Sequence, residues 1–161
     1  MRIKHLNLQR GVAAVELGLL LVPLIWIVFG ISEYGRAFYE YNTIVKNARS
    51  AARYLTLVAP GNTTEITKAK NLVVYGNTTG GTKLVAGLSI SNVYVCDSKV
   101  SDGLLCKADE QAMQFTGSGN VNLVKVMVKN VTFASLVPGL VPGLDSGLVF
   151  GPISLTMAQV Q

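Results

Sequence analysis

Residues 12–31 read VAAVELGLLLVPLIWIVFGI, a run of 20 residues that contains a single charged side chain, Glu16. A helix needs about 20 apolar residues to cross the hydrocarbon core of a bilayer. Pro23 lies inside the run, and a lipid-embedded helix tolerates proline better than a helix in water does. The sequence therefore predicts a transmembrane helix over residues 12–31.

The residues before this run form a short basic segment, 1–11, in which Arg2, Lys4 and Arg10 carry the positive charges. A basic N-terminal flank predicts a cytoplasmic N-terminus, with the rest of the chain on the far side of the membrane. The alternative is a cleaved secretory signal. The glutamate near the start of the run and the lack of an A-x-A site after it disfavour that alternative, so we expect the apolar segment to be retained.

The overall charge does not predict a nucleic-acid partner. The chain has 161 residues and a formal net charge of +5, but three of its 14 Lys and Arg side chains lie in the basic flank. The other 11 stand against 9 Asp and Glu, which is close to neutral, and no basic stripe with interleaved aromatic residues is present. The length allows one membrane anchor and one modest domain.

Residues 32–58 continue the helix in amphipathic form. Their apolar and aromatic residues recur at spacings of three and four, which places them on one face. Glu33, Arg36 and Glu40 are spaced for intrahelical ion pairs, and Pro60-Gly61 ends the run. The predicted docking face consists of Tyr34, Phe38, Tyr41, Val45, Ala48, Ala52 and Leu55.

A single helix from about Val12 to Leu57 would be roughly 70 Å long. Its outer half needs an apolar partner, which is either a second copy of the helix in a coiled coil or a sheet of the same chain. The docking face is rich in Ala and Tyr and poor in Leu, so packing against a sheet fits it at least as well as a coiled coil does.

Residues 59–161 predict a small domain outside the membrane. Asn62-Thr63-Thr64-Glu65 is a helix start with capping residues, and 76–81 is a turn-rich loop. The segments 83–96, 121–134 and 153–160 predict strands, which gives an α+β fold with a long N-terminal helix packed on a small antiparallel sheet. The apolar face of the short helix would be Ile66, Ala69, Leu72 and Val73.

The segment 121–134 is the clearest strand of this domain. Val124, Val126 and Val128 alternate on one face, whereas Val131 and Phe133 fall on the opposite phase. A bulge near Lys129-Asn130 would restore a single apolar face. The repeated Val-Pro-Gly unit of residues 137–144 predicts a loop or hairpin excursion.

Two cysteines, Cys96 and Cys106, lie well after the membrane segment and are separated by nine residues. That span is compatible with a local disulfide, which would persist in an oxidising compartment. The alternative is a pair of reduced structural cysteines. The predicted topology favours the disulfide.

Two motifs resemble the TadE-like pilus assembly proteins. Gln9-Arg10-Gly11 precedes a small-residue stretch, a glutamate and an apolar run with proline, and residues 30–54 read GISEYGRAFYEYNTIVKNARSAARY. The similarity covers residues 9–55. It implies the plan of a pilin, in which the outer half of a long helix packs on an antiparallel sheet, and a role as a pseudopilin or minor pilin of a Tad (Flp) type IV pilus.

The resemblance also implies processing by a membrane peptidase after Gly11, with Arg10, Gly11 and Val12 forming the cleavage site. Glu16 would then be the fifth residue of the mature chain, where pilin-like proteins carry glutamate. Val12 replaces the phenylalanine of many type IV pilins, and Leu17 the tyrosine of Tad major pilins. These departures, and the length of the chain, weaken the interpretation as the main filament subunit.

Glu16 has a physical interpretation that is independent of the family. An ionised carboxylate inside a membrane costs a few kcal/mol and usually has a partner. The freed amine of Val12 in a neighbouring subunit would neutralise it and fix the axial register of the helices. The alternative is that Glu16 lies at the cytoplasmic headgroup level.

The sequence shows no enzyme. The only histidine, His5, lies in the basic leader, the acidic residues around the cysteines lack calcium-loop spacing, and no base accompanies the serines and threonines. We expect no catalytic residue, cofactor, metal, nucleic acid or small-molecule substrate. The expected partners are the membrane, other pilin-like subunits, the prepilin peptidase and the pilus assembly platform.

The leading hypothesis is a structural pilin-like subunit that supports adhesion, anchored in the inner membrane with its outer domain periplasmic or extracellular. One alternative is an uncleaved, membrane-anchored scaffold of the pilus or secretion apparatus. Another is a signal-anchored ligand-binding or adhesin domain.

Overall fold

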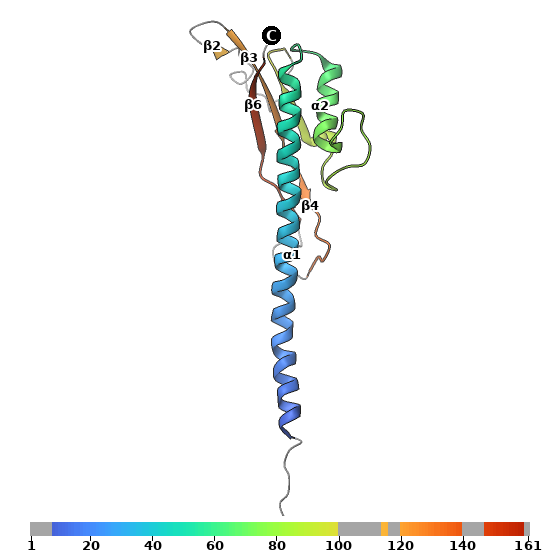
Figure 1. Cartoon of the computed structure of the whole chain (residues 1–161), viewed down its shortest axis with the longest axis vertical. Helices are drawn as coiled ribbons and strands as arrows, with labels where there is room; N and C mark the ends of the chain where they lie inside the picture. Colours follow the sequence, from blue (N-terminus) through green and yellow to red (C-terminus); the bar gives the residue numbers. More distant parts are fainter. Residues whose placement is uncertain (1–7, 100–113, 116–119, 140–146, 160–161) are drawn as a thin grey trace, which may run out of the picture.

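The computed structural model describes residues 8–99, 114–115, 120–139 and 147–159. The chain is a long rod with a head at one end, and a single helix, α1 (Leu8–Thr56), runs through both (Figure 1). The head adds α2 (Thr63–Tyr75), a 3₁₀ turn (Ile90–Asn92) and six short strands. These are β1 (Val93–Cys96), β2 (Gln114–Phe115), β3 (Asn120–Val128), β4 (Thr132–Phe133), β5 (Leu148–Val149) and β6 (Ile153–Gln159). The α+β arrangement predicted from the sequence is confirmed.

Helix α1 is 49 residues long and continues through Pro23 without interruption. It begins before the predicted Val12 and ends one residue before the predicted Leu57. Arg53 lies in its last turn, where a cation interacts favourably with the negative end of the helix dipole. The predicted segments 12–31 and 32–58 are therefore two parts of one element.

The main sheet is built around β3, which pairs antiparallel with β1, β2 and β6. Val126 stands opposite Val95 of β1 and Leu155 of β6. Because side chains alternate along strands, these three lie on the same face of the sheet. That face packs on the upper half of α1, which is the sheet partner that the amphipathic helix requires.

The core lies between this face, α1 and α2. Its helical side is made of small residues, and Ala48, Ala51 and Ala52 are fully buried, which brings the neighbouring elements close to the axis of α1. The other fully buried side chains include Ile44, Val73, Val74, Val95, Val126 and Phe133. Val124, Val126 and Val128 face the core as the sequence predicts.

Helix α2 begins and ends as its sequence predicts. The Asn62 side chain accepts a hydrogen bond from the backbone N–H of Glu65 at 3.3 Å, and Gly76 closes the helix at φ 74°. Its buried face contains Ile66, Ala69 and Val73, together with Val74. Leu72, which the sequence places on this face, is half-buried and packs at its edge.

The predicted strand 83–96 is correct only at its end, β1. Its middle part turns through the 3₁₀ segment instead, and Asn92 holds that turn. The Asn92 Oδ1 atom accepts from the Ser89 backbone N–H at 2.9 Å, and its Nδ2 donates to the Lys129 and Asn130 carbonyls. These contacts use the polar groups that a continuous strand would pair with a neighbour.

The predicted strand 121–134 is also shorter, and the bulge near Lys129-Asn130 is wrong. The main-sheet strand ends at Val128, and Asn130 adopts a left-handed φ of 57°. The chain then enters β4, which pairs with β5 in a separate two-stranded sheet. This change of sheet, rather than a bulge, buries Val131 and Phe133. Most of the predicted Val-Pro-Gly loop 137–144, namely residues 140–144, lies outside the described residues.

Gly87 is required where the chain crosses β4. A methyl group on its Cα would lie 1.9 Å from the carbonyl oxygen of Thr132, which is backbone and is held in the pairing of β4 with β5. Only glycine permits this approach.

We expect Gly87→Ala to destabilise the head by on the order of 3 kcal/mol, because the methyl group overlaps a backbone oxygen. Thermal unfolding of the full chain in detergent micelles, followed by near-UV circular dichroism, measures the loss. Gly151→Ala is the matched control, because a methyl group there meets no atom within 4 Å. Equal unfolding temperatures for the two variants would contradict the close approach of Gly87 to Thr132.

Candidate membrane anchor and the ion cluster above it

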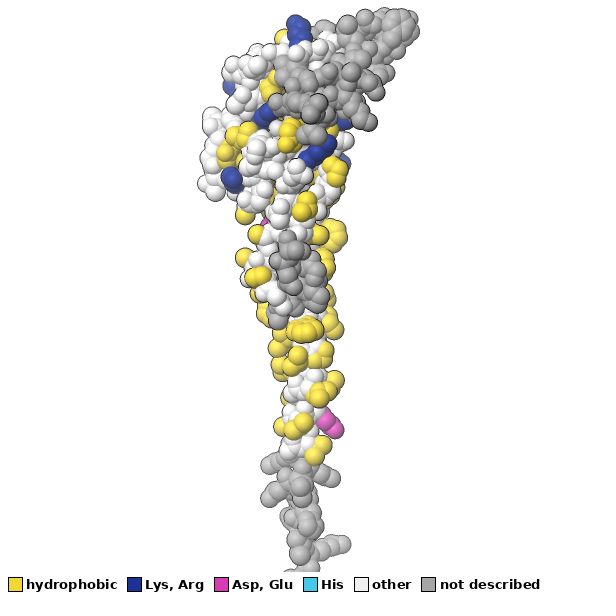
Figure 2. Space-filling model, turned by 180° about the vertical axis from the view of Figure 1, so that it is seen from behind, with side chains coloured by type: hydrophobic (Ala, Val, Ile, Leu, Met, Phe, Trp, Pro, Cys, Tyr) yellow, Lys and Arg dark blue, Asp and Glu magenta, His cyan; other side chains and the backbone are white. Residues whose placement is uncertain are grey.

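The lower part of α1 projects from the head as an exposed apolar shaft. No residue of its most apolar stretch is buried, and α1 is long and apolar enough to cross a membrane. Leu19 is 73% exposed and Ile31 is 70% exposed. Figure 2 shows hydrophobic side chains along the visible face of the shaft, with the Lys and Arg side chains confined to the head. Lipid is the environment that such a surface requires.

Glu16 is exposed on this shaft. Its carboxylate makes no hydrogen bond or ion pair with any group that the structure describes. The predicted cleavage site lies in the same helix, because Gly11 and Val12 are exposed residues near the start of α1, and a methyl group on Gly11 would meet nothing within 4 Å. The side chain of Arg10 and the whole of His5 lie outside the described residues.

Three charged side chains form an ion cluster just above the shaft. The Arg36 guanidinium donates to Glu40 Oε1 at 2.8 Å and to Glu33 Oε2 at 3.1 Å. These are the two intrahelical pairs that the sequence spacing predicts. The cluster also reaches the segment after β4: Arg36 donates to the Ala134 carbonyl, and Glu33 Oε2 accepts from the Leu136 backbone N–H at 3.3 Å.

The ion cluster is largely shielded from solvent, so its geometry matters for stability. Glu33 is 5% exposed, and the Arg36 guanidinium carbon lies 4.1 Å from the centre of the Phe133 ring. Arginine suits this position because its planar fork serves several acceptors while its face stacks on an aromatic ring. The cluster therefore fixes how α1 is rotated relative to the segment 132–136.

The predicted docking face agrees with the structure only in its upper half. Ala48, Ala52 and Leu55 are buried, and Val45 is half-buried against the core. Tyr34, Phe38 and Tyr41 lie instead on the outside, 45%, 68% and 36% exposed. The buried positions in this lower half are Glu33, Ala37 and Ile44.

This difference arises from polar contacts of α1. An apolarity pattern places the aromatic residues inward, but the ion cluster turns the charged face of α1 toward residues 134–136. The only signal in the sequence is the spacing of Glu33, Arg36 and Glu40, which predicts the ion pairs but not their burial.

An apolar groove runs beside the displaced aromatic residues. It has a volume of about 320 Å³ and is formed by α1 together with β5 and the residues after it. The Tyr41 and Phe150 rings meet edge to face, with their centroids 5.7 Å apart. The residues of the apolar groove are Tyr34, Ala37, Phe38, Tyr41, Leu148, Val149, Phe150 and Gly151.

The upper end of α1 is held by polar contacts that the sequence does not indicate. Gln159, at the end of β6, donates from Nε2 to the Leu55 and Val58 carbonyls, each at 3.2 Å. These carbonyls belong to the helix end, where intrahelical donors are missing. Tyr54 donates to Glu65 of α2. Lys68 Nζ donates to Glu65 Oε1 at 2.8 Å. The hydrogen bonds from Lys68 and Tyr54 lower the pKa of the Glu65 carboxyl.

The cysteine prediction is only partly described. Cys96 is fully buried at the end of β1, and Cys106 lies outside the described residues, so the disulfide stays a prediction. Within the described ranges, no group of three or more His, Cys, Asp or Glu side chains is arranged to hold a metal ion.

A comparison with protein families identifies the lower and middle parts of α1. Residues 11–53 match the family described as TadE-like protein. The match confirms the resemblance over the apolar shaft, the ion cluster and most of the docking face, and it indicates a role in Tad pilus assembly. Searches of the curated proteins and of the solved structures found no significant match.

We expect Arg36→Met to destabilise the chain by about 2–3 kcal/mol, because it leaves the shielded carboxylates of Glu33 and Glu40 without their cation. Chemical unfolding in micelles, followed by circular dichroism, measures this loss. Arg53→Met is the control, since it removes an exposed cation from the same helix. A loss no greater than that of the control would contradict a structural role for the ion cluster.

Proposed function

We propose that the chain is a pilin-like subunit, a minor pilin or pseudopilin, in the assembly of a Tad (Flp) type IV pilus that supports adhesion. The observation that carries the proposal is the continuity of α1. One unbroken helix presents an apolar surface below and packs on a sheet above, and the TadE-like match spans the junction. A subunit of this shape docks sideways on similar helices through its shaft. The proposed role is structural rather than enzymatic.

In the proposed topology the N-terminus is cytoplasmic, because the basic flank precedes the membrane segment. The head then lies in the periplasm or outside the cell. A prepilin peptidase would cut after Gly11, and the platform of the pilus machine would receive the processed subunit. An oxidising compartment on that side would also favour the predicted disulfide between Cys96 and Cys106.

Glu16 supports this proposal because it has no partner among the residues that the structure describes. A carboxylate on a lipid-facing helix costs a few kcal/mol unless a cation neutralises it. After processing, the amine of Val12 is such a cation. Val12 lies four residues, or about 6 Å along the axis, from Glu16. A neighbouring subunit displaced by that distance would bring its amine to the carboxylate, and repeating this displacement generates a helical filament.

We expect Gly11→Ala to block processing and Glu16→Ala to allow processing but prevent incorporation, so that both variants abolish the contribution of this subunit to piliation. Mass spectrometry of the mature N-terminus and electron microscopy of pili measure the two steps. Gly18→Ala is the control for processing, because it adds the same methyl group to the same open helix surface away from the cleavage site.

The outcomes separate the proposed functions. A chain that begins at Val12 supports the pilin-like subunit. An intact N-terminus with normal piliation would favour an uncleaved scaffold of the apparatus, and filaments that form normally without the protein would favour an anchored binding domain.

A further inference from the structure

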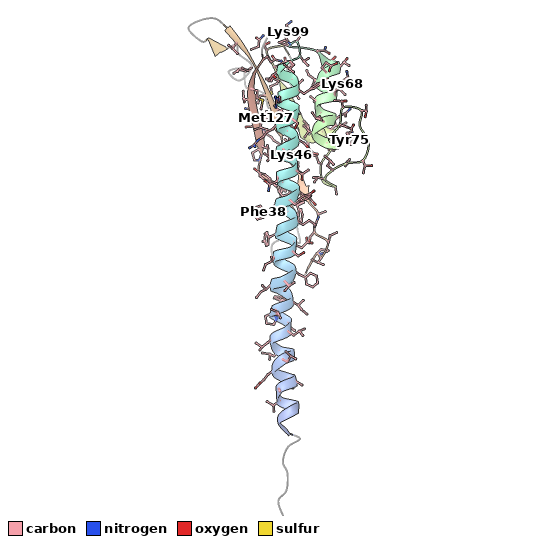
Figure 3. All side chains as sticks on the ribbon, viewed as in Figure 1. Phe38, Lys46, Lys68, Tyr75, Lys99 and Met127 are labelled. Atoms are coloured by element: carbon pink, nitrogen blue, oxygen red, sulfur yellow. The ribbon has the colours of Figure 1, made fainter. Side chains whose placement is uncertain are left out.

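The apolar surface of α1 does not end where the predicted membrane segment ends. Beyond Ile31, the aromatic residues Tyr34 and Phe38 stay exposed on the side of the apolar groove. Figure 3 places Phe38 in the lower part of the head, below Lys46 on the same helix. We call the exposed residues Tyr34 and Phe38, with Val149 and Leu136 beside them, the collar. It adjoins the shaft directly.

The lower edge of the head adds apolar residues at the same level. Val149 is 58% exposed on the wall of the apolar groove. Leu136 is 74% exposed, and its backbone is held at this level by Glu33. The collar is therefore built from three segments that are far apart in the sequence.

The charges at this level are mostly covered. Arg36 pairs with both Glu33 and Glu40, so the ion cluster carries a formal charge of −1, and its two carboxylates are shielded from solvent. Lys129 stands at the rim, beside Val149 and Phe150. A cation beside an apolar and aromatic belt fits a bilayer interface, where phosphates adjoin acyl chains.

The helix register puts the collar at the membrane surface. Glu16 has no partner among the described residues of a single subunit, and an unpaired carboxylate is most stable at the cytoplasmic headgroup level. The hydrocarbon core then begins at Leu17, five residues beyond the start of the predicted segment 12–31, and about 20 residues later it ends near Arg36, so the covered ion cluster lies at its outer boundary. Phe38 and Tyr41 follow about 3 Å and 7 Å further along the axis, within a headgroup layer that is about 5–8 Å thick.

We propose that, before assembly, the head is seated on the outer leaflet, with the collar and the apolar groove occupied by lipid. The inference rests on the proposed membrane insertion of the shaft but not on the role in the pilus. Lipid is favoured over a second protein because the collar continues the lipid-covered surface without a break and carries aromatic residues and a rim cation.

The test uses tryptophan fluorescence of the full chain in vesicles of phosphatidylethanolamine and phosphatidylglycerol. Trp26 is the only tryptophan. In a Trp26→Phe background, Phe38→Trp reports on the collar. Leu57→Trp reports on a similarly exposed site, 74% against 68%, at the far end of the helix. We expect headgroup-labelled quencher lipids to remove much of the Phe38→Trp emission and to leave the Leu57→Trp emission unchanged.

The unmodified chain separates failure of this inference from failure of the anchor. Quenching of Trp26 by lipids brominated deep in the acyl chain shows that the shaft is inserted. If Trp26 is quenched but Phe38→Trp emits as in water and is not quenched, the shaft is inserted but the collar does not contact lipid, which overturns the proposal. Blue-shifted but unquenched Phe38→Trp emission would mean that protein covers the collar, which also overturns the proposal. Unquenched Trp26 would overturn both.

Discussion

The backbone of α1 is the constraint on which the rest of the molecule depends. Each residue of a helix turns it by about 100°, so the side chains of one unbroken helix cannot choose their directions independently. Once the polar contacts of Arg36 and Gln159 fix the rotation of the docked half of α1, the directions of Tyr34 and Glu16 are fixed as well. The contacts in the head therefore determine which side of the shaft carries its only carboxylate.

Two sets of polar contacts hold this helix at the ends of its docked half. Below, Arg36 joins Glu33 and Glu40 to the segment after β4. Above, Gln159 supplies donors to the open end of the helix. Between them the buried residues of α1 are alanines with Ile44 and Leu55. The alanines permit a close approach but specify rotation weakly because a methyl group has little shape to interlock. The polar contacts therefore specify the rotation of α1, and the buried apolar surface stabilises its packing on the head.

The sequence predicted the features that depend on local chemistry. The long helix, the cap of α2 at Asn62, the turn that starts at Gly76, and the alternation of Val124, Val126 and Val128 follow from periodicity and from local turn chemistry. It failed where distant segments compete for the same surface. Tyr34 and Phe38 look inward by pattern but are displaced by the ion cluster, whose acceptor at Ala134 lies 98 residues away from Arg36. Gly87 and Gln159 likewise act through partners that no local pattern reveals.

The continuity of α1 across the membrane surface is tested most directly by the distance between two spin labels in lipid vesicles. Labels introduced through non-natural amino acids at Leu24 and Asn42, both exposed, lie five full turns apart on one side of the helix and on either side of the ion cluster. An unbroken helix predicts one narrow distribution centred near 27 Å. A broad or clearly shorter distribution would mean that the helix bends or breaks between shaft and head, and would contradict the rigid coupling of Glu16 to the head.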